Sequence, residues 1–262
     1  MRRYKAEGHE RDCCDKKCIK GIMSQDLKTS QLLECLQDKK SDIYHMTQIA
    51  FTYHSNHIEG NQLNYNQIQS MFETNTISIK EQLIKIDDIR EAMNHFQCID
   101  TIIKQVNTEL TTTFIKELHA ILKSATSQYS QQGLKPGEYK KWANEVGGRM
   151  TVLPEDVPQR MKALLQEYHG KENKSFDDIL DFHVKFERIH PFQDGNGRVG
   201  RLIMFKECLK YGIVPFIIED DLKMFYYRGL NEWGHERGYL RDTCLSAQDQ
   251  YKAYLDYFRI PY

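Results

Sequence analysis

The sequence has no long hydrophobic run, only six prolines and almost no net charge. Its longest apolar stretches, such as residues 213–218, are far shorter than the ~20 residues that a membrane-spanning helix needs. The chain has 36 lysine and arginine residues and 37 aspartate and glutamate residues, which gives a formal charge of −1. This balance argues against binding to nucleic acid or anionic lipid that is mainly electrostatic. We therefore expect neither a membrane partner nor a nucleic-acid partner.

The seven cysteines have neither the spacing of a disulfide framework nor that of a zinc site. They stand at 13, 14, 18, 35, 98, 208 and 244, and no apolar signal segment follows Met1. These features predict a reduced, cytoplasmic protein. A metal held by Cys13, Cys14, Cys18 and His9 is not expected, because their spacing fits no zinc pattern and no second cluster follows.

Apolar residues recur at helical spacing along most of the chain. Residues 1–28 are charged and lack this period, so we expect a flexible leader there. The period then predicts helices at about 41–59, 87–104, 114–122, 155–168, 175–189 and after 197, followed by two closing helices. We divide the remaining chain into N-terminal helices over 29–80 and a main helical domain with the C-terminal helices over 81–262.

One segment departs from the helical pattern. Residues 145–152 contain two short extended runs around Gly147 and Gly148, which is typical of a β-hairpin. The predicted fold class is therefore all-α, a helical bundle with one small β-hairpin.

The segment from His190 to Arg201 carries the chemistry. It reads His-Pro-Phe-Gln-Asp-Gly-Asn-Gly-Arg-Val-Gly-Arg, a helix end, a glycine-rich loop and the start of another helix. Gly195 and Gly197 allow backbone N–H groups to approach a phosphate, and the helix that follows directs its positive end at the same anion. Arg198, three residues before Arg201, lies on the same face, so both can reach a polyphosphate.

Two further residues of this segment complete a reaction site. Asp194 stands at the rim of the loop, where a divalent cation such as Mg²⁺ bridges a carboxylate and phosphates. His190 can act as a general base near neutral pH. A base, a metal ligand and an anion cradle within twelve residues indicate phosphoryl or nucleotidyl transfer.

This string resembles the signature of the Fic family, and every fixed position is present. The resemblance implies a Fic-like helical fold, ATP and Mg²⁺, and transfer of AMP to a tyrosine, threonine or serine hydroxyl of a target protein. The intact Gly-Asn-Gly-Arg portion differs from Doc-type relatives that transfer phosphate, while transfer of phosphocholine or UMP stays open. The resemblance implies that His190 is the general base and that Asp194 is the Mg²⁺ ligand. It also implies that Gly195, Asn196 and Gly197 surround the α- and β-phosphates, that Arg198 contacts the β-phosphate and that Arg201 contacts the γ-phosphate.

Two other segments resemble nucleotide-binding parts of the same family. The hairpin, with Val146, Gly147, Gly148 and Arg149, resembles the family's flap. The flap is a hairpin whose backbone lines the nucleotide and whose exposed strand edge can pair with an extended segment of the target protein. Residues 225–233 resemble the stretch that closes on the adenine, which implies contacts from Tyr226, Tyr227 and Asn231. An ordinary surface hairpin and an aromatic helix face packed in the core are the alternatives.

Residues 55–61 resemble the family's inhibitory motif, Ser/Thr-x-x-x-Glu-Gly/Asn, in its N-terminal placement (class II type). The resemblance implies that Glu59 pairs with Arg201, takes the place of the γ-phosphate and inhibits the same chain. Ser55 lies one turn earlier and would orient the Glu59 carboxylate. The alternative is a solvated glutamate at a helix end.

The leading hypothesis is an autoinhibited protein adenylyltransferase. A second is hydrolysis of AMP–protein bonds, with Glu59 aligning a water. A third, a non-catalytic nucleotide-binding interaction module, would favour a broken signature, and this one is complete. The sequence leaves open the target, self-modification, the trigger and whether the chain is a homo-oligomer.

Overall fold

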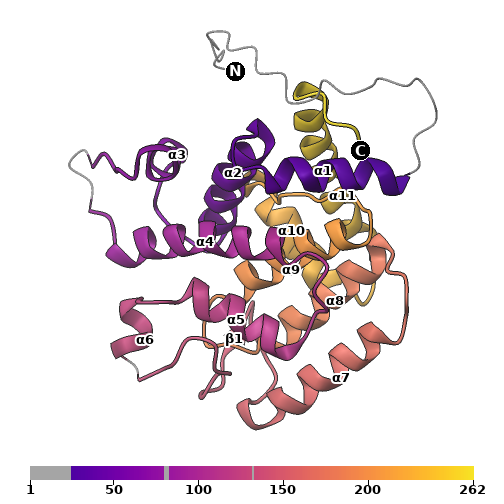
Figure 1. Cartoon of the computed structure of the whole chain (residues 1–262). Coiled ribbons are helices and arrows are strands. Elements are labelled where there is room, and N and C mark those ends of the chain that lie inside the picture. Colours follow the sequence, from indigo (N-terminus) through magenta and orange to yellow (C-terminus); the bar gives the residue numbers. More distant parts are fainter. Residues whose placement is uncertain (1–24, 80–82, 132) are drawn as a thin grey trace.

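A computed structural model describes residues 25–79, 83–131 and 133–262. These residues form eleven α-helices, two short 3₁₀ helices and one two-stranded antiparallel sheet, so the predicted fold class is confirmed (Figure 1). The elements are α1 (Gln25–Gln37), α2 (Asp42–Ile58), α3 (Tyr65–Thr74), α4 (Ile86–Lys104), α5 (Thr112–Leu122), α6 (Ser127–Gln131), β1 (Glu145–Val146), β2 (Arg149–Met150), η1 (Pro154–Asp156), α7 (Val157–His169), α8 (Phe176–Ile189), α9 (Asn196–Lys210), η2 (Asp220–Leu222), α10 (Lys223–Glu232) and α11 (Gly238–Tyr257).

Helix ends follow local capping chemistry. The Ser41 hydroxyl accepts the Tyr44 N–H at the start of α2, and Ser175 forms a reciprocal capping box with Asp178 at the start of α8. The sequence predicted helices that begin at about these two residues. Helices α3 and α6 had no predicted counterpart, and α1 begins inside the range expected as leader.

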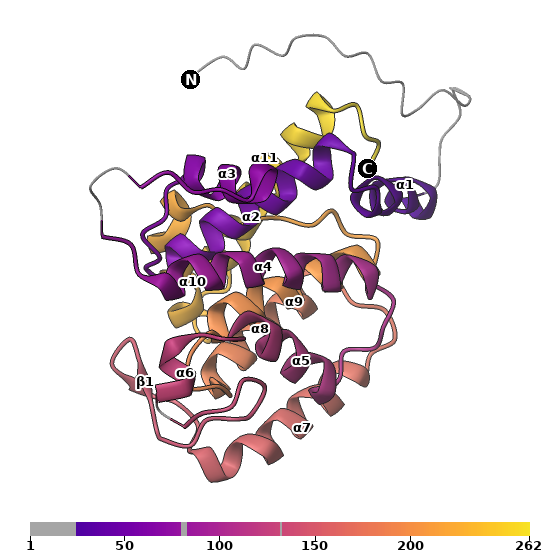
Figure 2. The ribbon, with the colours of Figure 1, turned by 60° about the vertical axis from the view of Figure 1, so that its left-hand side comes forward.

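Helix α9 is the centre of the molecule. Every residue from Asn196 to Leu209 is buried, and α9 packs against α2, α4, α5 and α8. Both views show α9 and α8 between α7 at one end and α1 at the other (Figures 1 and 2). A helix buried on all sides can retain charged side chains only if they find partners, so the arginines of α9 must be paired within the protein.

The N-terminal helices share this core. Phe51 of α2 packs in the same apolar cluster as Ile99 of α4 and Phe205 of α9. Phe51 and Phe205 have ring centroids 5.2 Å apart. This packing fixes α2 against α9, with the C-terminal end of α2 beside the first turn of α9.

The expected leader and its cysteine cluster lie largely outside the described residues, since Cys13, Cys14, Cys18 and His9 all precede residue 25. Within the described part of the chain, Cys98, Cys208 and Cys244 are buried thiols, and no three metal-binding side chains converge. No helix among those described is both long and apolar enough to cross a bilayer.

Candidate active site

The loop between α8 and α9 is held by backbone conformations at its two ends. His190 ends α8 with φ of 52°, a left-handed conformation, while its N–H still bonds to Phe186 O. Gly195 starts α9 with φ of 84°. A Cβ at Gly195 would also lie only 3.3 Å from Leu122 Cδ2, so both the conformation and the close approach favour glycine.

Two side chains brace this loop from inside. Asn196 accepts the Phe192 N–H at 2.8 Å and donates to the Phe192 carbonyl at 2.9 Å. His119 of α5 stacks on the Phe192 ring, and its Nε2 lies 3.1 Å from the Asp194 carbonyl oxygen. Because Asn196 is buried and both its contacts are with Phe192, its side chain shapes the loop, and only its backbone is left for the predicted phosphate cradle.

Glu59 meets Arg201 at the first turn of α9. Arg201 Nη2 donates to Glu59 Oε1 at 2.7 Å, and the Arg201 side chain is only 2% exposed. The Glu59 carboxylate lies directly over Gly197, where an added Cβ would collide with Oε1. The carboxylate therefore occupies the position at the α9 N-terminus where an anion would be expected.

The contacts of Ser55 differ from the expectation. Its hydroxyl accepts Arg201 Nε–H at 3.0 Å and its carbonyl accepts Nη2–H at 2.9 Å, so Ser55 orients the arginine and not the Glu59 carboxylate. The Glu59–Arg201 pair is consequently a single contact, because the second bond of Nη2 goes to Ser55. Arg201 Nη1 makes no hydrogen bond within the described residues, so Arg201 holds Glu59 through one N–H and not through a two-pronged pair.

Arg198 is held by a second carboxylate, that of Glu91 on α4. Its Nη1 pairs with Glu91 Oε2 and lies 3.3 Å from Asn56 Oδ1, while Nη2 lies 3.4 Å from Asp194 Oδ2. Glu91 Oε1 pairs in turn with Lys123. Both arginines of the signature are thus bound by carboxylates that come from outside it.

Asp194 is the residue expected to hold Mg²⁺. Burial opposes ionisation of its carboxyl, but the neighbouring Arg198 and Lys123 charges hold its pKa well below the ordinary value. The side chain is 35% exposed at the mouth of the loop. One carboxylate beside a phosphate-binding loop fits the way Mg²⁺ is usually held, by one or two carboxylates together with substrate phosphates and water.

His190 is mostly buried, with 16% of its side chain exposed. Burial, and next the charge of Lys140, lowers its pKa to about 4, so the imidazole is neutral at physiological pH and free to accept a proton. Nδ1 lies 3.9 Å from Glu187 Oε2. Burial and the nearby Glu59 charge raise the pKa of Glu187 to about 8, which keeps that carboxyl largely protonated near neutrality.

The predicted hairpin is present, with Val146 paired to Arg149 and left-handed backbone at Gly147 and Gly148. All four of these residues are exposed. Lys140 ties the hairpin base to the loop: its Nζ donates to Asn144 Oδ1, to Thr151 Oγ1 and, at 3.4 Å, to the Ile189 carbonyl. The hairpin therefore stands beside His190.

Helix α10 presents only part of its aromatic face. Tyr226 is fully buried, and its hydroxyl lies 2.6 Å from His183 Nε2, so its ring is packed in the core in this arrangement. Tyr227 is at the surface, with its hydroxyl 3.3 Å from the Ile58 carbonyl, and Asn231 is exposed. The core alternative therefore holds for Tyr226, whereas Tyr227 and Asn231 remain accessible.

Four residues at this site were not anticipated: Glu91, Lys123, Lys140 and Glu187. Glu187 stands three residues before His190, and its spacing within the helix was the one available signal. The other three come from elements distant in sequence, and Lys123 reaches Asp194 across 71 residues.

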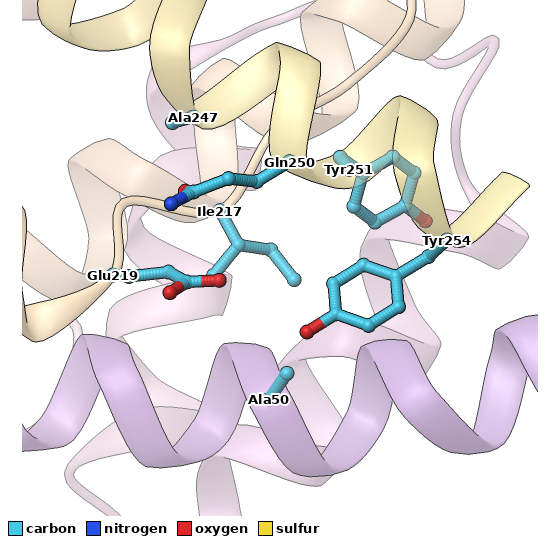
Figure 3. Close-up of a pocket in the computed structure, with 7 residues that line it drawn as sticks. All are labelled: Ala50, Ile217, Glu219, Ala247, Gln250, Tyr251 and Tyr254. Carbon is cyan, nitrogen blue, oxygen red and sulfur yellow. The ribbon is translucent and has the colours of Figure 1, made fainter. Parts of the chain in front are cut away.

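A separate small pocket lies between α2 and α11 (Figure 3). Ala50 of α2 faces Tyr251 and Tyr254 of α11 there, with Ile217 and Glu219 beside them. None of the predicted site residues lines it, so the candidate active site is the first turn of α9 and not this pocket.

The segment that contains the signature also matches known proteins. Residues 109–208 match the model of the Fic/DOC family. The protein adenylyltransferase Fic of Nematostella vectensis is 27% identical over 210 residues, 78% of this chain and 48% of that protein. Protein adenylyltransferase fic-1 of Caenorhabditis elegans is 24% identical over 255 residues, 89% and 48% of the two chains. The chain thus spans about half the length of the curated relatives it matches.

Solved structures show the same fold. A Fic domain containing signaling protein from Bacteroides thetaiotaomicron superposes with a TM-score of 0.65 at 24% identity, covering 90% of this chain and 93% of that one. Fic-1 from C. elegans gives a TM-score of 0.67 at 21% identity, covering 88% and 71%. Residues 109–208, which contain the complete signature and match the family model, thus carry a Fic domain, and the chain has the fold of Fic proteins.

Proposed function

We propose that this chain is a protein adenylyltransferase that transfers AMP from ATP to a hydroxyl side chain of a target protein, and that Glu59 restrains it. One observation carries the proposal: the complete signature places His190, the α9 N-terminus and both arginines around one loop, with a carboxylate already seated on that N-terminus. The names of the relatives support the same activity.

The nucleotide would bind through the first turn of α9. Free N–H groups at a helix N-terminus and two arginines on one face suit a polyphosphate. Arg198 and Arg201 must first exchange their present carboxylate partners, Glu91 and Glu59, for phosphate oxygens. Asp194 would hold Mg²⁺, which when bound helps to neutralise the phosphate charge.

His190 would take the proton from the target hydroxyl. The hydroxyl oxygen then forms a bond to the α-phosphorus, and the bond to the bridging oxygen of pyrophosphate breaks. The neutral imidazole suits this role. The exposed edge of the flap, next to the His190 loop, would receive an extended target segment as an added strand.

Glu59 would restrain transfer by competing for Arg201. While Arg201 donates to Glu59 and Ser55, it has less capacity for a γ-phosphate. ATP could still bind in that state, but with its α-phosphate out of line for attack.

The test is incorporation of labelled AMP from ATP, into the protein itself and into lysate proteins, by wild type, Glu59→Gly and the Glu59→Gly/His190→Ala double variant. Transfer should rise in Glu59→Gly and fall by about 10²–10⁴ when His190 is also removed, while calorimetry shows ATP binding retained. Full transfer without His190 would overturn the mechanism. Release of inorganic phosphate without AMP incorporation would overturn the reaction class.

A further inference from the structure

Glu187 lies in the last turn of α8, three residues before His190. Its Oε2 atom lies 3.9 Å from His190 Nδ1, and only 14% of its side chain is exposed. The His190 Nδ1 atom is itself buried and makes no hydrogen bond within the described residues. A carboxyl group therefore stands beside the buried nitrogen of the imidazole, and the other ring nitrogen, Nε2, is left for a substrate.

The close approach of α8 to α9 holds Glu187 in this position. A Cβ at Gly200 would lie 2.7 Å from Glu187 Oε1 and 2.7 Å from His183 Cε1, so both side chains pack against the Gly200 backbone. In the part of the chain that the structure describes, Glu187 Oε1 has no hydrogen-bond partner either. Buried polar groups without partners are rare, and a role in catalysis is one of the usual reasons for keeping them.

The position of the imidazole proton decides whether His190 can act as a base. A neutral histidine accepts a proton at Nε2 only while its own proton is on Nδ1. An acceptor that faces Nδ1 selects this tautomer, in the way that a third group orients the base of a catalytic triad. Glu187 offers two such acceptors, its carboxyl and its backbone carbonyl, and the carbonyl opposes the lowering of the His190 pKa by burial. Only a change of the side chain distinguishes the two.

We propose that Glu187 is a positioning residue for His190, whose carboxyl accepts the Nδ1–H of the imidazole and so leaves the lone pair of Nε2 free for the proton of the target hydroxyl. The proposal rests on the proposed function, because it takes His190 as the base. As the hydroxyl oxygen bonds to the α-phosphorus and pyrophosphate leaves, the hydroxyl proton moves to Nε2 and the Nδ1 proton stays on the ring. The Glu187 carboxyl then faces the imidazolium and stabilises it.

Glu59 opposes this contact. Burial, and next the Glu59 charge, raises the pKa of Glu187 to about 8, whereas the Arg201 charge acts in the other direction. Without Glu59, the Arg201 charge remains and the Glu187 carboxyl ionises more readily. An ionised carboxylate can only accept a hydrogen bond, so the contact with Nδ1–H should be strongest in Glu59→Gly. This variant is therefore the background for the test.

The test is the tautomer of His190 in Glu59→Gly, read by nuclear magnetic resonance of protein that contains ¹⁵N-labelled histidine. The His190 signal is identified by its loss in Glu59→Gly/His190→Ala. We expect the proton on Nδ1 in Glu59→Gly and a shift of the proton to Nε2 when Glu187→Leu is added. The same addition should lower kcat for labelled AMP incorporation by about 10–100-fold, while KM for ATP changes by less than about threefold.

Glu187→Gln tests for rescue, because its amide oxygen can still accept the Nδ1–H. In the Glu59→Gly background it should restore the Nδ1–H signal and most of the transfer that Glu187→Leu loses. Glu207→Gln is the matched control at a second buried carboxyl, in the last turn of α9. Glu207 contacts Lys206 Nζ at 2.8 Å and the Tyr168 hydroxyl at 3.0 Å, so this change should alter neither the His190 tautomer nor the transfer.

A proton on Nε2 of His190 in Glu59→Gly would overturn the proposal, and this result needs no Glu187 variant that folds. An Nδ1–H signal that persists unchanged in Glu187→Leu would overturn it too, because the backbone carbonyl would then be sufficient. A lack of AMP transfer by Glu59→Gly would instead overturn the proposed function, while the tautomer measurement would still decide whether Glu187 orients His190.

Discussion

The Glu59 carboxylate, at the C-terminal end of α2, lies 2.7 Å from Nη2 of Arg201, on the first turn of α9. The arginine is buried, whereas a quarter of the glutamate side chain remains exposed. The buried Arg201 guanidinium is therefore held in place, whereas the Glu59 carboxylate has room to move away from it. The first prediction depends on this difference.

Replacing Glu59 with glycine should raise AMP transfer by at least about tenfold, because productive alignment of the α-phosphate is worth several kcal/mol. It should also lower the free energy of unfolding by about 1–3 kcal/mol, since Arg201 is then buried with only Ser55 and the Tyr226 ring as partners and no carboxylate to match its charge. Labelled AMP incorporation and urea unfolding measure the two effects. Arg201→Ala in the same background should cancel the gain; unchanged transfer in Glu59→Gly alone would refute the inhibition.

Replacing Ser55 with alanine should not release the inhibition. Its hydroxyl bonds to Arg201 and not to Glu59, so the Glu59–Arg201 contact survives. Transfer should stay within about threefold of wild type, and stability should fall by about 1.5–3 kcal/mol, the range for hydrogen bonds to charged groups. The same two assays apply, and activation as large as that of Glu59→Gly would contradict the observed geometry.

Lys140→Met should move the acid limb of the pH–rate profile to higher pH. Burial, followed by the Lys140 charge, lowers the pKa of His190 to about 4, and loss of that charge should raise it toward the ordinary 6.5. Transfer by Glu59→Gly, measured between pH 4 and 8, gives the profile. The control is Lys141→Met, an exposed neighbour whose Nζ bonds to the Gly133 carbonyl, and it should leave the acid limb in place.

The protein should lose stability as the pH falls from about 7 to 4. Burial lowers the pKa of His119 and His183 to about 3 and, together with the Lys140 charge, lowers that of His190 to about 4. As the pH falls, these histidines therefore bind protons in the unfolded chain while they stay neutral in the folded chain. Burial also lowers the pKa of His54 and His95. Glu187, with a pKa raised to about 8 by burial and Glu59, and Glu219, with a pKa raised by burial, act in the opposite direction but are two groups against five histidines. Each additional proton bound by the unfolded chain relative to the folded chain lowers the free energy of unfolding by about 1.4 kcal/mol per pH unit of acidification.

Urea unfolding at several pH values measures this dependence. A free energy of unfolding that stays constant or rises between pH 7 and 5 would show that these histidines titrate normally in the folded chain. His119→Asn, which removes one of these histidines, should reduce the slope.

The sequence predicted what is local along the chain. Ser41 and Ser175 begin their helices as expected, and His190 to Arg201 form one loop and one helix turn, because capping and glycine conformations depend on neighbouring residues. Glu59 could be matched to Arg201 only through the family resemblance, since no local signal joins residues so far apart in sequence.

Partners brought together by packing could not be predicted. Lys123 follows an ordinary amphipathic stripe, and its burial depends on α4 supplying Glu91 and the loop supplying Asp194. The burial of Tyr226 could not be predicted for a related reason. An aromatic residue at helical spacing fits the core as well as a ligand, and here Gly229 lets α10 pack closely on Leu240.

Under the proposed inhibition, the placement of Glu59 just beyond α2 predicts a measurable background transfer of AMP by the wild type. Ser55 and Asn56 hydrogen-bond to Arg201 and Arg198, which holds the helix body in place, whereas Glu59 lies at the C-cap of α2 next to left-handed Gly60. Helix ends open at far lower free energy than helix interiors. The ratio of AMP transfer by wild type to transfer by Glu59→Gly would then equal the fraction of molecules in which the last turn of α2 is open. Hydrogen exchange of the Glu59 and Gly60 amides would measure the same open fraction.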